Sequence, residues 1–190
     1  YKKLRLSQRL GQPFLKQNGM EVRKNMGEFR YEKVKDPEYF MDHRMDAHSD
    51  HVAYASWKES EEEKSSYRYS LDGIWKFHYA KNYEQTIKGF EETGVDCHSW
   101  DDIRVPAHIQ MEGYDSPQYV NVQYPWDGRE AIMPGEIPQR FNPVASYVKY
   151  FEVPEQMKDK PLYISFQGAE SGLAVWLNGN FVGYSEVTFT

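Results

Sequence analysis

Apolar and polar residues alternate with a period of two in four segments of the chain. In the first of them, LDGIWKFHY, the alternation places Trp75, Phe77 and Tyr79 on one face and polar residues on the other, directly after an Asp72-Gly73 turn. Successive side chains of a strand point to opposite sides, so this pattern is typical of a strand with one buried face. We therefore expect a half-buried antiparallel strand here.

Three later segments repeat the pattern. They are SYVKYFEVP, PLYISFQG and GLAVWLNGNFVGYSE, and in the last of them Asn178-Gly179 suits a tight hairpin turn. Since no long helical period lies between the segments, the pattern predicts an all-β, antiparallel β-sandwich. Between the first two lie residues 106–143, a stretch rich in Pro, Gly, Tyr and Asp. Long ordered loops on a β scaffold are frequent binding sites.

The chain before the first strand has no such pattern. Residues 1–50 are polar and charged with scattered Gly and Pro, and we expect an extended N-terminal arm there. Residues 57–67, WKESEEEKSSY, have a helical composition and predict a short solvated helix. The sequence thus divides into an arm over 1–50 and a β domain over 51–190.

Composition narrows the class of partner. The 190 residues suffice for one sizeable domain, and the 16% share of aromatic residues supplies large buried rings. A formal net charge of −6 argues against nucleic acid, because neutralising phosphates needs a surplus of clustered Lys and Arg.

Cysteine usage and hydropathy bear on the compartment. Cys97 is the only cysteine, so neither an intramolecular disulfide nor a cysteine-based zinc site can form within the chain. No apolar run approaches the length of a membrane span, and the sequence contains no Asn-x-Ser/Thr acceptor. We expect a cytoplasmic protein without a membrane partner.

Two groups of residues invite a chemical interpretation. The segment HRMDAHSDH crowds potential metal ligands together, but no apolar frame surrounds it, and a solvated loop is the favoured interpretation. The acidic runs over residues 61–63 and 101–102 are the obvious carboxylate pairs for acid/base chemistry, and both are expected on the surface. Because GAESG lacks the central serine of a nucleophile elbow, the chain's own residues do not indicate an enzyme. The ligand candidates in the first group are His43, Asp46, His48, Asp50 and His51.

The loop segment GYDSPQYVNVQYPWDG, residues 113–128, interleaves Tyr, Asn, Asp and Trp. Proteins bind sugars with this mixture, since aromatic faces stack on the pyranose and amide or carboxylate groups bond its hydroxyls. A tyrosine-rich loop packed for rigidity would have the same composition. The residues alone leave both interpretations open.

A resemblance goes further than the composition. VPAHIQMEGYDSPQYVNVQYP resembles the signature of the β-galactosidases of glycoside hydrolase family 2, and LDGIWKFHY, NPVASYVKYFEVP and PLYISFQGAESGLAVWLNGNFVGYSE are similar to the strands of that family's N-terminal domain. Upstream, DPEYF and RMDAHSD are similar to the family's arm. The likeness is co-linear over about residues 31–190.

The resemblance implies a jelly-roll, galactose-binding-like sandwich that precedes an immunoglobulin-like domain and a catalytic barrel in a longer polypeptide. The parent enzyme would hydrolyse terminal β-galactosyl residues, such as that of lactose, by a retaining mechanism with barrel glutamates, so this chain alone is expected to be inactive. The expected partners are a galactoside, the downstream domains and further copies in a homo-oligomer. No cofactor is expected in the chain itself, whereas the parent would use Mg²⁺ and a monovalent cation.

The same resemblance assigns the substrate-binding residues. Asn121, in the Y-x-N-V motif, would hydrogen-bond the galactosyl hydroxyls, with Val122 as a lesser contact. A neutral amide both donates and accepts, so it pairs with hydroxyls without adding charge beside catalytic acids. Asp36 and Glu186 stand where some relatives hold magnesium, but the arm diverges from the family's and no metal site is assigned. Residues 107–109, AHI, replace the family's Ser-Asn-Trp.

Three other functions remain open at this stage. A β-glucuronidase or β-mannosidase of the same family is less favoured, because the GYD-x-P-x-Y-x-N block resembles galactosidases and a glucuronate pocket needs a cation. A free-standing carbohydrate-binding module or lectin would bind galactose in isolation. A structural domain for oligomer assembly would self-associate without sugar.

Overall fold

A computed structural model gives the fold of the chain. It describes residues 28–49, 51–117, 121, 126, 128 and 130–186 and, for the backbone alone, the strands Lys2–Gln8 and Leu15–Lys16.

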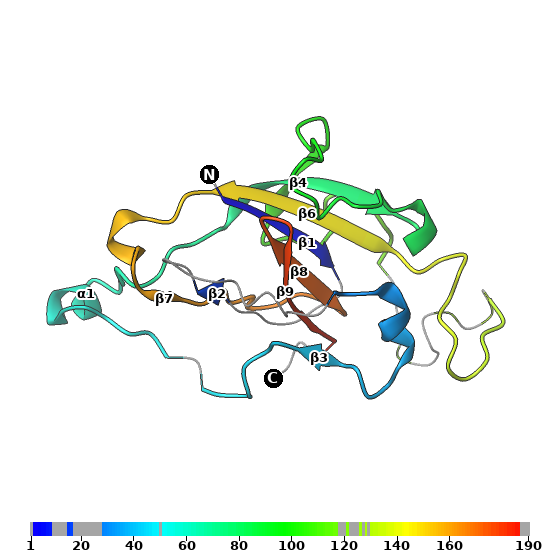
Figure 1. The fold of residues 1–190 in the computed structure, drawn as a ribbon, viewed down its shortest axis with the longest axis horizontal. Coiled ribbons are helices and arrows are strands. Elements are labelled where there is room, and N and C mark those ends of the chain that lie inside the picture. Colours follow the sequence, from blue (N-terminus) through cyan, green and yellow to red (C-terminus); the bar gives the residue numbers. More distant parts are fainter. Residues whose placement is uncertain are drawn as a thin grey trace.

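The dominant element is a seven-stranded sheet in which every neighbouring pair is antiparallel (Figure 1). A separate two-stranded ladder lies below it in that view. The strands of the large sheet, in spatial order, are β3 (Met41–Asp42), β9 (Asn180–Ser185), β8 (Leu173–Leu177), β1 (Lys2–Gln8), β6 (Val144–Phe151), β4 (Gly73–Ala80) and β5 (Asp101–Val105). The small ladder pairs β2 (Leu15–Lys16) with β7 (Pro161–Leu162).

Helical structure is limited to short turns at the periphery. The single α-helix of the described residues is α1 (Trp57–Glu61), and three 3-10 turns accompany it. The all-β prediction is thereby confirmed, and the short helix predicted within residues 57–67 forms over Trp57–Glu61. The 3-10 turns are η1 (Tyr31–Lys35), η2 (Tyr83–Gln85) and η3 (Glu155–Met157).

Strands form in all four segments in which apolar and polar residues alternate. Strands β8 and β9 form a hairpin whose two turn residues, Asn178 and Gly179, have φ of 51° and 81°, and positive φ at both central positions is what the tightest hairpin turn requires. The segment PLYISFQG is a strand only over Pro161–Leu162. Beyond β7 the alternation nevertheless persists in burial, since residues 162, 164 and 166 are half-buried while 163, 165 and 167 are exposed.

One face of the sheet carries the first hydrophobic cluster. Register explains its composition, because Phe77 of β4 lies opposite Tyr147 of β6 and Trp75 opposite Ile103 of β5, which places all four side chains on the same side. Residues of the 162–169 segment and of the 106–143 loop pack over this face and form the second layer of the sandwich. The buried members are Trp75, Phe77, Ile103, Ala145, Tyr147, Leu173, Val175, Leu177 and Val182.

The opposite face carries the second cluster, and part of the expected arm covers it. The ring of Phe29 lies 4.9 Å from that of Tyr184 and 5.8 Å from that of Trp176, and Tyr39 stacks on Tyr184 at 5.3 Å. Residues 81–100 supply the remaining cover. The buried members are Phe90, Cys97, Val148, Ala174, Trp176, Phe181 and Tyr184.

The region expected to be an extended arm therefore contributes to the sandwich. Strand β1 pairs with both β6 and β8 at the middle of the large sheet. Its sequence KKLRLSQ does alternate, but over so few residues that the pattern did not stand out from the polar surroundings. The proposed boundary at residue 50 stays a prediction. No helix within the described ranges combines the length and the hydropathy needed to cross a membrane.

Candidate functional site

The loop over residues 106–143 begins with a compact turn after β5. Amide groups of Glu112 and Tyr114 donate to the carbonyl of Ile109, each at 3.1 Å, and Gly113 between them has a φ of 92°. A positive φ of this size favours glycine, because a Cβ would collide with the backbone. Ile109 and Tyr114 pack on the first hydrophobic cluster. An aliphatic residue thus occupies the place of the family's aromatic and still ties the loop to the core.

Tyr114, from the GYD motif, attaches this end of the loop to the core. Its ring lies edge-on to Phe77 at 4.5 Å and near Tyr79 at 6.3 Å. Burial, assisted by a hydrogen bond to the Asp101 carboxylate, raises the pKa of the Tyr114 phenol. The hydroxyl is therefore protonated at neutral pH and donates to Asp101, so this acid is a structural partner of the loop.

The far end of the loop is closed by a carboxylate. Glu130 accepts the backbone amides of Gln139 and Arg140, one on each oxygen and each at 3.0 Å. Hydrogen bonds from the Arg140 and Gln139 amides lower the pKa of the Glu130 carboxyl. Trp126 adds a bond from its indole nitrogen to the carbonyl of Phe141 at 3.0 Å. The two limbs of the loop are thereby joined side by side.

The closed end is attached to the sheet just after β4. The amide of Asn142 donates to the carbonyl of Lys81 at 2.9 Å, and the side chain of Asn82 donates to the carbonyl of Arg140 at 3.3 Å. Asn142 is itself buried and donates to the hydroxyl of Tyr31 at 3.2 Å. Both ends of the loop therefore rest on fixed points of the sandwich.

The sequence-predicted binding residue lies between these two attachments. Asn121 is exposed, which agrees with a side chain that meets a ligand from outside the sandwich. Val122, predicted as the lesser contact, lies outside the described residues. Their assignment to substrate stays a prediction.

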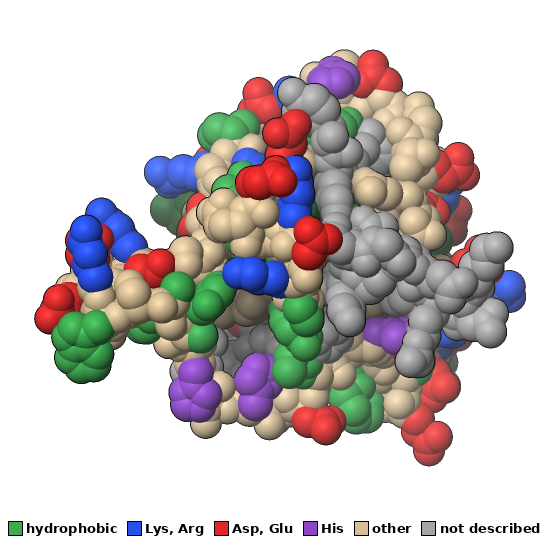
Figure 2. All heavy atoms as spheres, turned by 60° about the vertical axis from the view of Figure 1, so that its left-hand side comes forward, with side chains coloured by type: hydrophobic (Ala, Val, Ile, Leu, Met, Phe, Trp, Pro, Cys, Tyr) green, Lys and Arg blue, Asp and Glu red, His purple; other side chains and the backbone are tan. Residues whose placement is uncertain are grey.

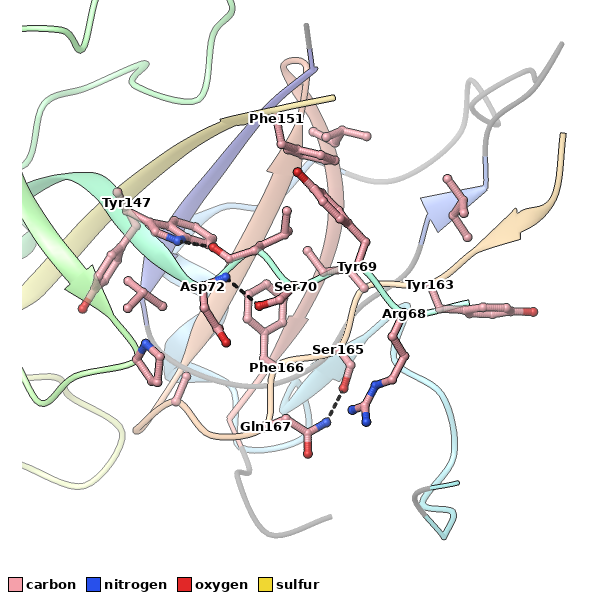
Figure 3. Close-up of a pocket in the computed structure, with 18 of the residues that line it drawn as sticks. Arg68, Tyr69, Ser70, Asp72, Tyr147, Phe151, Tyr163, Ser165, Phe166 and Gln167 are labelled. Atoms are coloured by element: carbon pink, nitrogen blue, oxygen red, sulfur yellow. Dashed lines mark hydrogen bonds between the residues drawn. The ribbon is translucent and has the colours of Figure 1, made fainter. Parts of the chain in front are cut away.

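A second feature lies beside the start of the loop. A groove of about 660 Å³ opens between the first face of the large sheet and the segment around β7, and residues 105–107 form part of its wall. Figure 3 shows Tyr147 and Phe151 beside the strands of the sheet, Phe166 among the other lining residues, and Tyr163 at the outer side. Its volume and its largely apolar lining, which includes several aromatic rings, are those of a small-molecule site.

Polar side chains lie on two sides of the groove. Arg68, Ser165 and Gln167 lie close together on one side, and the amide of Gln167 donates to the Ser165 hydroxyl at 2.8 Å (Figure 3). Asp72 lies on the other side, where its backbone amide donates to the hydroxyl of Ser70 at 3.0 Å. Sequence analysis missed this groove, because its walls come from residues about a hundred positions apart.

Several of the carboxylates and histidines considered for catalysis or metal binding have structural partners. Asp102 pairs with Lys76 at 2.8 Å, and Glu61 accepts the indole N–H of Trp57. His43 pairs with Asp42 at 2.7 Å. The described residues contain no cluster of three or more His, Cys, Asp or Glu side chains suited to a metal ion.

The residues considered for magnesium are also separately engaged. Asp36 accepts the amide of Glu38 at 3.0 Å, and Glu186 accepts the hydroxyl of Tyr184. Of the histidine-rich group, His48 is bonded to the carbonyl of Asp46 at 2.8 Å, and Asp50 lies outside the described residues.

Comparison with known proteins identifies similar chains. Residues 68–190 match the family model described as "Glycosyl hydrolases family 2, sugar binding domain". A β-galactosidase of Halalkalibacterium halodurans is 54% identical over 158 residues, which are 83% of this chain and 16% of that protein. One of Streptococcus thermophilus is 48% identical over 87% of this chain and 16% of that protein. A β-galactosidase large subunit of Latilactobacillus sakei is 37% identical over 81% of this chain and 27% of its own length. The chain thus spans between about a sixth and about a quarter of these relatives.

Proposed function

The chain belongs to the sugar-binding domain of glycosyl hydrolase family 2, and on that premise we propose that it forms one wall of the galactoside pocket of a β-galactosidase. The names of its relatives favour this substrate over a glucuronide or mannoside. In the proposed parent enzyme, terminal β-galactosyl residues, such as that of lactose, are hydrolysed with retention by two glutamates outside this chain. The magnesium and monovalent cations implied for the parent remain an expectation for the longer protein.

The observation that carries the proposal is a loop attached at both ends with an exposed amide between them. Tyr114 holds one end to the core and Glu130 closes the other, and Asn121 lies between these two attachments in the sequence. Because an amide donates and accepts at once, Asn121 suits a sugar hydroxyl. The wall's task is to bind and orient the galactosyl group, which leaves the proton and bond chemistry to the glutamates.

This division of labour predicts weak binding by the chain alone. One amide and one apolar contact supply about 1 to 2 kcal/mol of net stabilisation, against an association cost of roughly 4 kcal/mol or more. A pocket wall of this kind contributes to affinity only when the rest of the pocket is present.

The test is Asn121→Ala in the full-length enzyme. Loss of one or two hydrogen bonds should lower kcat/KM by about 5- to 30-fold, that is about 1 to 2 kcal/mol. Met111→Ala is the matched control, because Met111 belongs to the same loop and is 78% exposed. An unchanged kcat/KM in Asn121→Ala would refute the proposal that this chain forms a wall of the galactoside pocket.

The groove favours a second candidate, a self-sufficient carbohydrate-binding module. Its aromatic rings and polar side chains suit a sugar without help from other domains. Ligand-observed NMR of the chain with galactose and lactose separates the two functions. Micromolar binding that depends on Tyr69 would favour the module, whereas absent or millimolar binding favours the wall.

A further inference from the structure

Residues 51–70, here called the α1 lobe, extend away from the sheet at one end of the molecule (Figure 1). Figure 2 turns this end forward and shows charged side chains of both signs beside hydrophobic ones on its surface. None of the five residues of α1 is buried. Trp57 is the first residue of α1. Its side chain is 80% exposed, which is the highest exposed fraction of any large hydrophobic residue in the described part of the chain.

Hydrogen bonds hold the lobe in shape where a hydrophobic core is lacking. The hydroxyl of Ser56 accepts the amide of Glu59 at 3.2 Å and caps the helix. The Glu59 carboxylate accepts the amides of Ala55 at 3.0 Å and Ser66 at 3.1 Å, so it joins the residues before and after the helix. The order of the lobe therefore does not depend on the Trp57 ring.

The Trp57 ring itself is held in a fixed orientation. Its indole nitrogen donates to the carboxylate of Glu61, one turn later, at 2.9 Å. An aromatic group that is already oriented loses little conformational freedom when it is buried, and tryptophan is the residue type most enriched at the energetic centres of protein interfaces. Such a side chain is suited to enter an apolar pocket of another surface.

The surroundings of Trp57 define the charge of that other surface. Three consecutive acids, Glu61, Glu62 and Glu63, lie at and just after the C-terminal end of α1, and Glu62 forms a 3.8 Å ion pair with Lys58. Charge complementarity with this run of acids favours a pocket that has Lys or Arg around it.

We propose that the α1 lobe docks, through Trp57, into an apolar pocket with a basic rim on another region of the same longer polypeptide. The length of the relatives argues for that occupant, because the Halalkalibacterium protein matches this chain over only 16% of its own residues. The inference rests on the proposed function insofar as it needs a longer parent protein. It does not involve Asn121.

Acrylamide quenching of tryptophan fluorescence tests the docking, with wild type compared to Trp57→Phe in the 190-residue chain and in the full-length protein. In the chain, Trp57 should contribute a strongly quenched component that Trp57→Phe lacks. In the full-length protein most of that component should disappear, since the indole is enclosed in the pocket. Equal quenching of Trp57 in both proteins would overturn the proposal.

A charge variant and a dilution series complete the test. Glu62→Lys in the full-length protein should restore quenching of Trp57, and no change would overturn the basic rim. If the protection of Trp57 from acrylamide disappears on dilution as an oligomer dissociates, the pocket lies on a second copy of the protein. That result would overturn docking onto the same polypeptide. Thermal unfolding supplies the matched control: Trp57→Ala should lower the Tm of the full-length protein alone, whereas Met133→Ala, 67% exposed on the loop, should change neither Tm.

The two proposals fail separately. Asn121→Ala should lower kcat/KM without altering the quenching of Trp57. Trp57→Phe keeps an apolar ring and should leave kcat/KM unchanged. A wild-type kcat/KM in Asn121→Ala with Trp57 protected would refute the pocket wall alone, and the reverse pair of results would refute the docking alone.

Discussion

Phe77→Ala is the substitution for which the structure gives the clearest expected cost. Phe77 is 0% exposed in the middle of β4. Its ring meets Tyr147 of β6 at 4.8 Å with an interplanar angle of 63°, and Tyr114 of the loop at 4.5 Å with an angle of 65°. The side chain thus connects the sheet to the loop over residues 106–143 as well as filling the core.

The expected loss of stability in Phe77→Ala follows from both roles of the side chain. Truncation of a buried Phe to Ala costs about 3 to 5 kcal/mol through lost transfer energy and the cavity left behind. Edge-on aromatic pairs contribute about 0.5 to 1.5 kcal/mol each beyond their buried area, and Phe77 makes two with Tyr147 and Tyr114, so the upper half of the range is expected. Against a total stability of about 5 to 15 kcal/mol, this loss is large enough to measure with certainty.

Urea unfolding of the chain, followed by tryptophan fluorescence, is the assay. Ile74→Ala is the matched control, because Ile74 lies on the same strand at 59% exposure and its truncation should change the free energy of unfolding by about 0.5 kcal/mol or less. A Phe77→Ala loss below about 1.5 kcal/mol with an unchanged m value would refute the assignment of Phe77 to the centre of the core.

Three further outcomes are expected. Glu130→Gln should speed amide hydrogen exchange at Gln139 and Arg140, because the replacement offers one acceptor oxygen where the carboxylate offers two. Backbone hydrogen bonds lower the pKa of Glu59 below 4.5, so its stabilisation of the α1 lobe is complete above pH 4.5 and is lost as the pH falls further. Amide chemical shifts followed by NMR should show this loss, and Glu59→Gln should remove the pH dependence. Burial lowers the pKa of His78 below 6.5 in the folded protein. Its contribution to stability is therefore present above pH 6.5 and is lost as the pH falls through the lowered pKa of the folded protein. The urea midpoints at pH 7 and pH 5 should differ less in His78→Phe than in wild type.

The strands of the first face could be predicted because burial follows the alternation of the sequence. Trp75 and Phe77 are buried, as expected, and Tyr79 at the strand end is half-buried. The order of strands could not be predicted in this way. Period-two patterns state which face of a strand is buried but carry no information on its neighbours, so nothing in KKLRLSQ indicated a place between β6 and β8.

The candidate site, too, could be predicted from the sequence only in part. Composition singled out the loop, and a family resemblance singled out Asn121 within it. The closure by Glu130 left no sequence signal, since its two amide partners lie nine and ten residues away and backbone donors are available from any residue except proline. Glu130 was therefore one acidic residue among many until the structure placed it.

Strand β4 provides the physical link between fold and site. Phe77, within β4, holds the Tyr114 end of the loop, and Lys81, the residue directly after β4, holds the closed end through Asn142. Both attachments thus depend on one strand, which is fixed on each side by an antiparallel neighbour. A slip of β4 by one residue would exchange its buried and exposed faces and remove both attachments at once. Substitutions that weaken β4 should therefore disturb the loop around Asn121 before those that weaken the β9 side of the sheet, which lies four strands away.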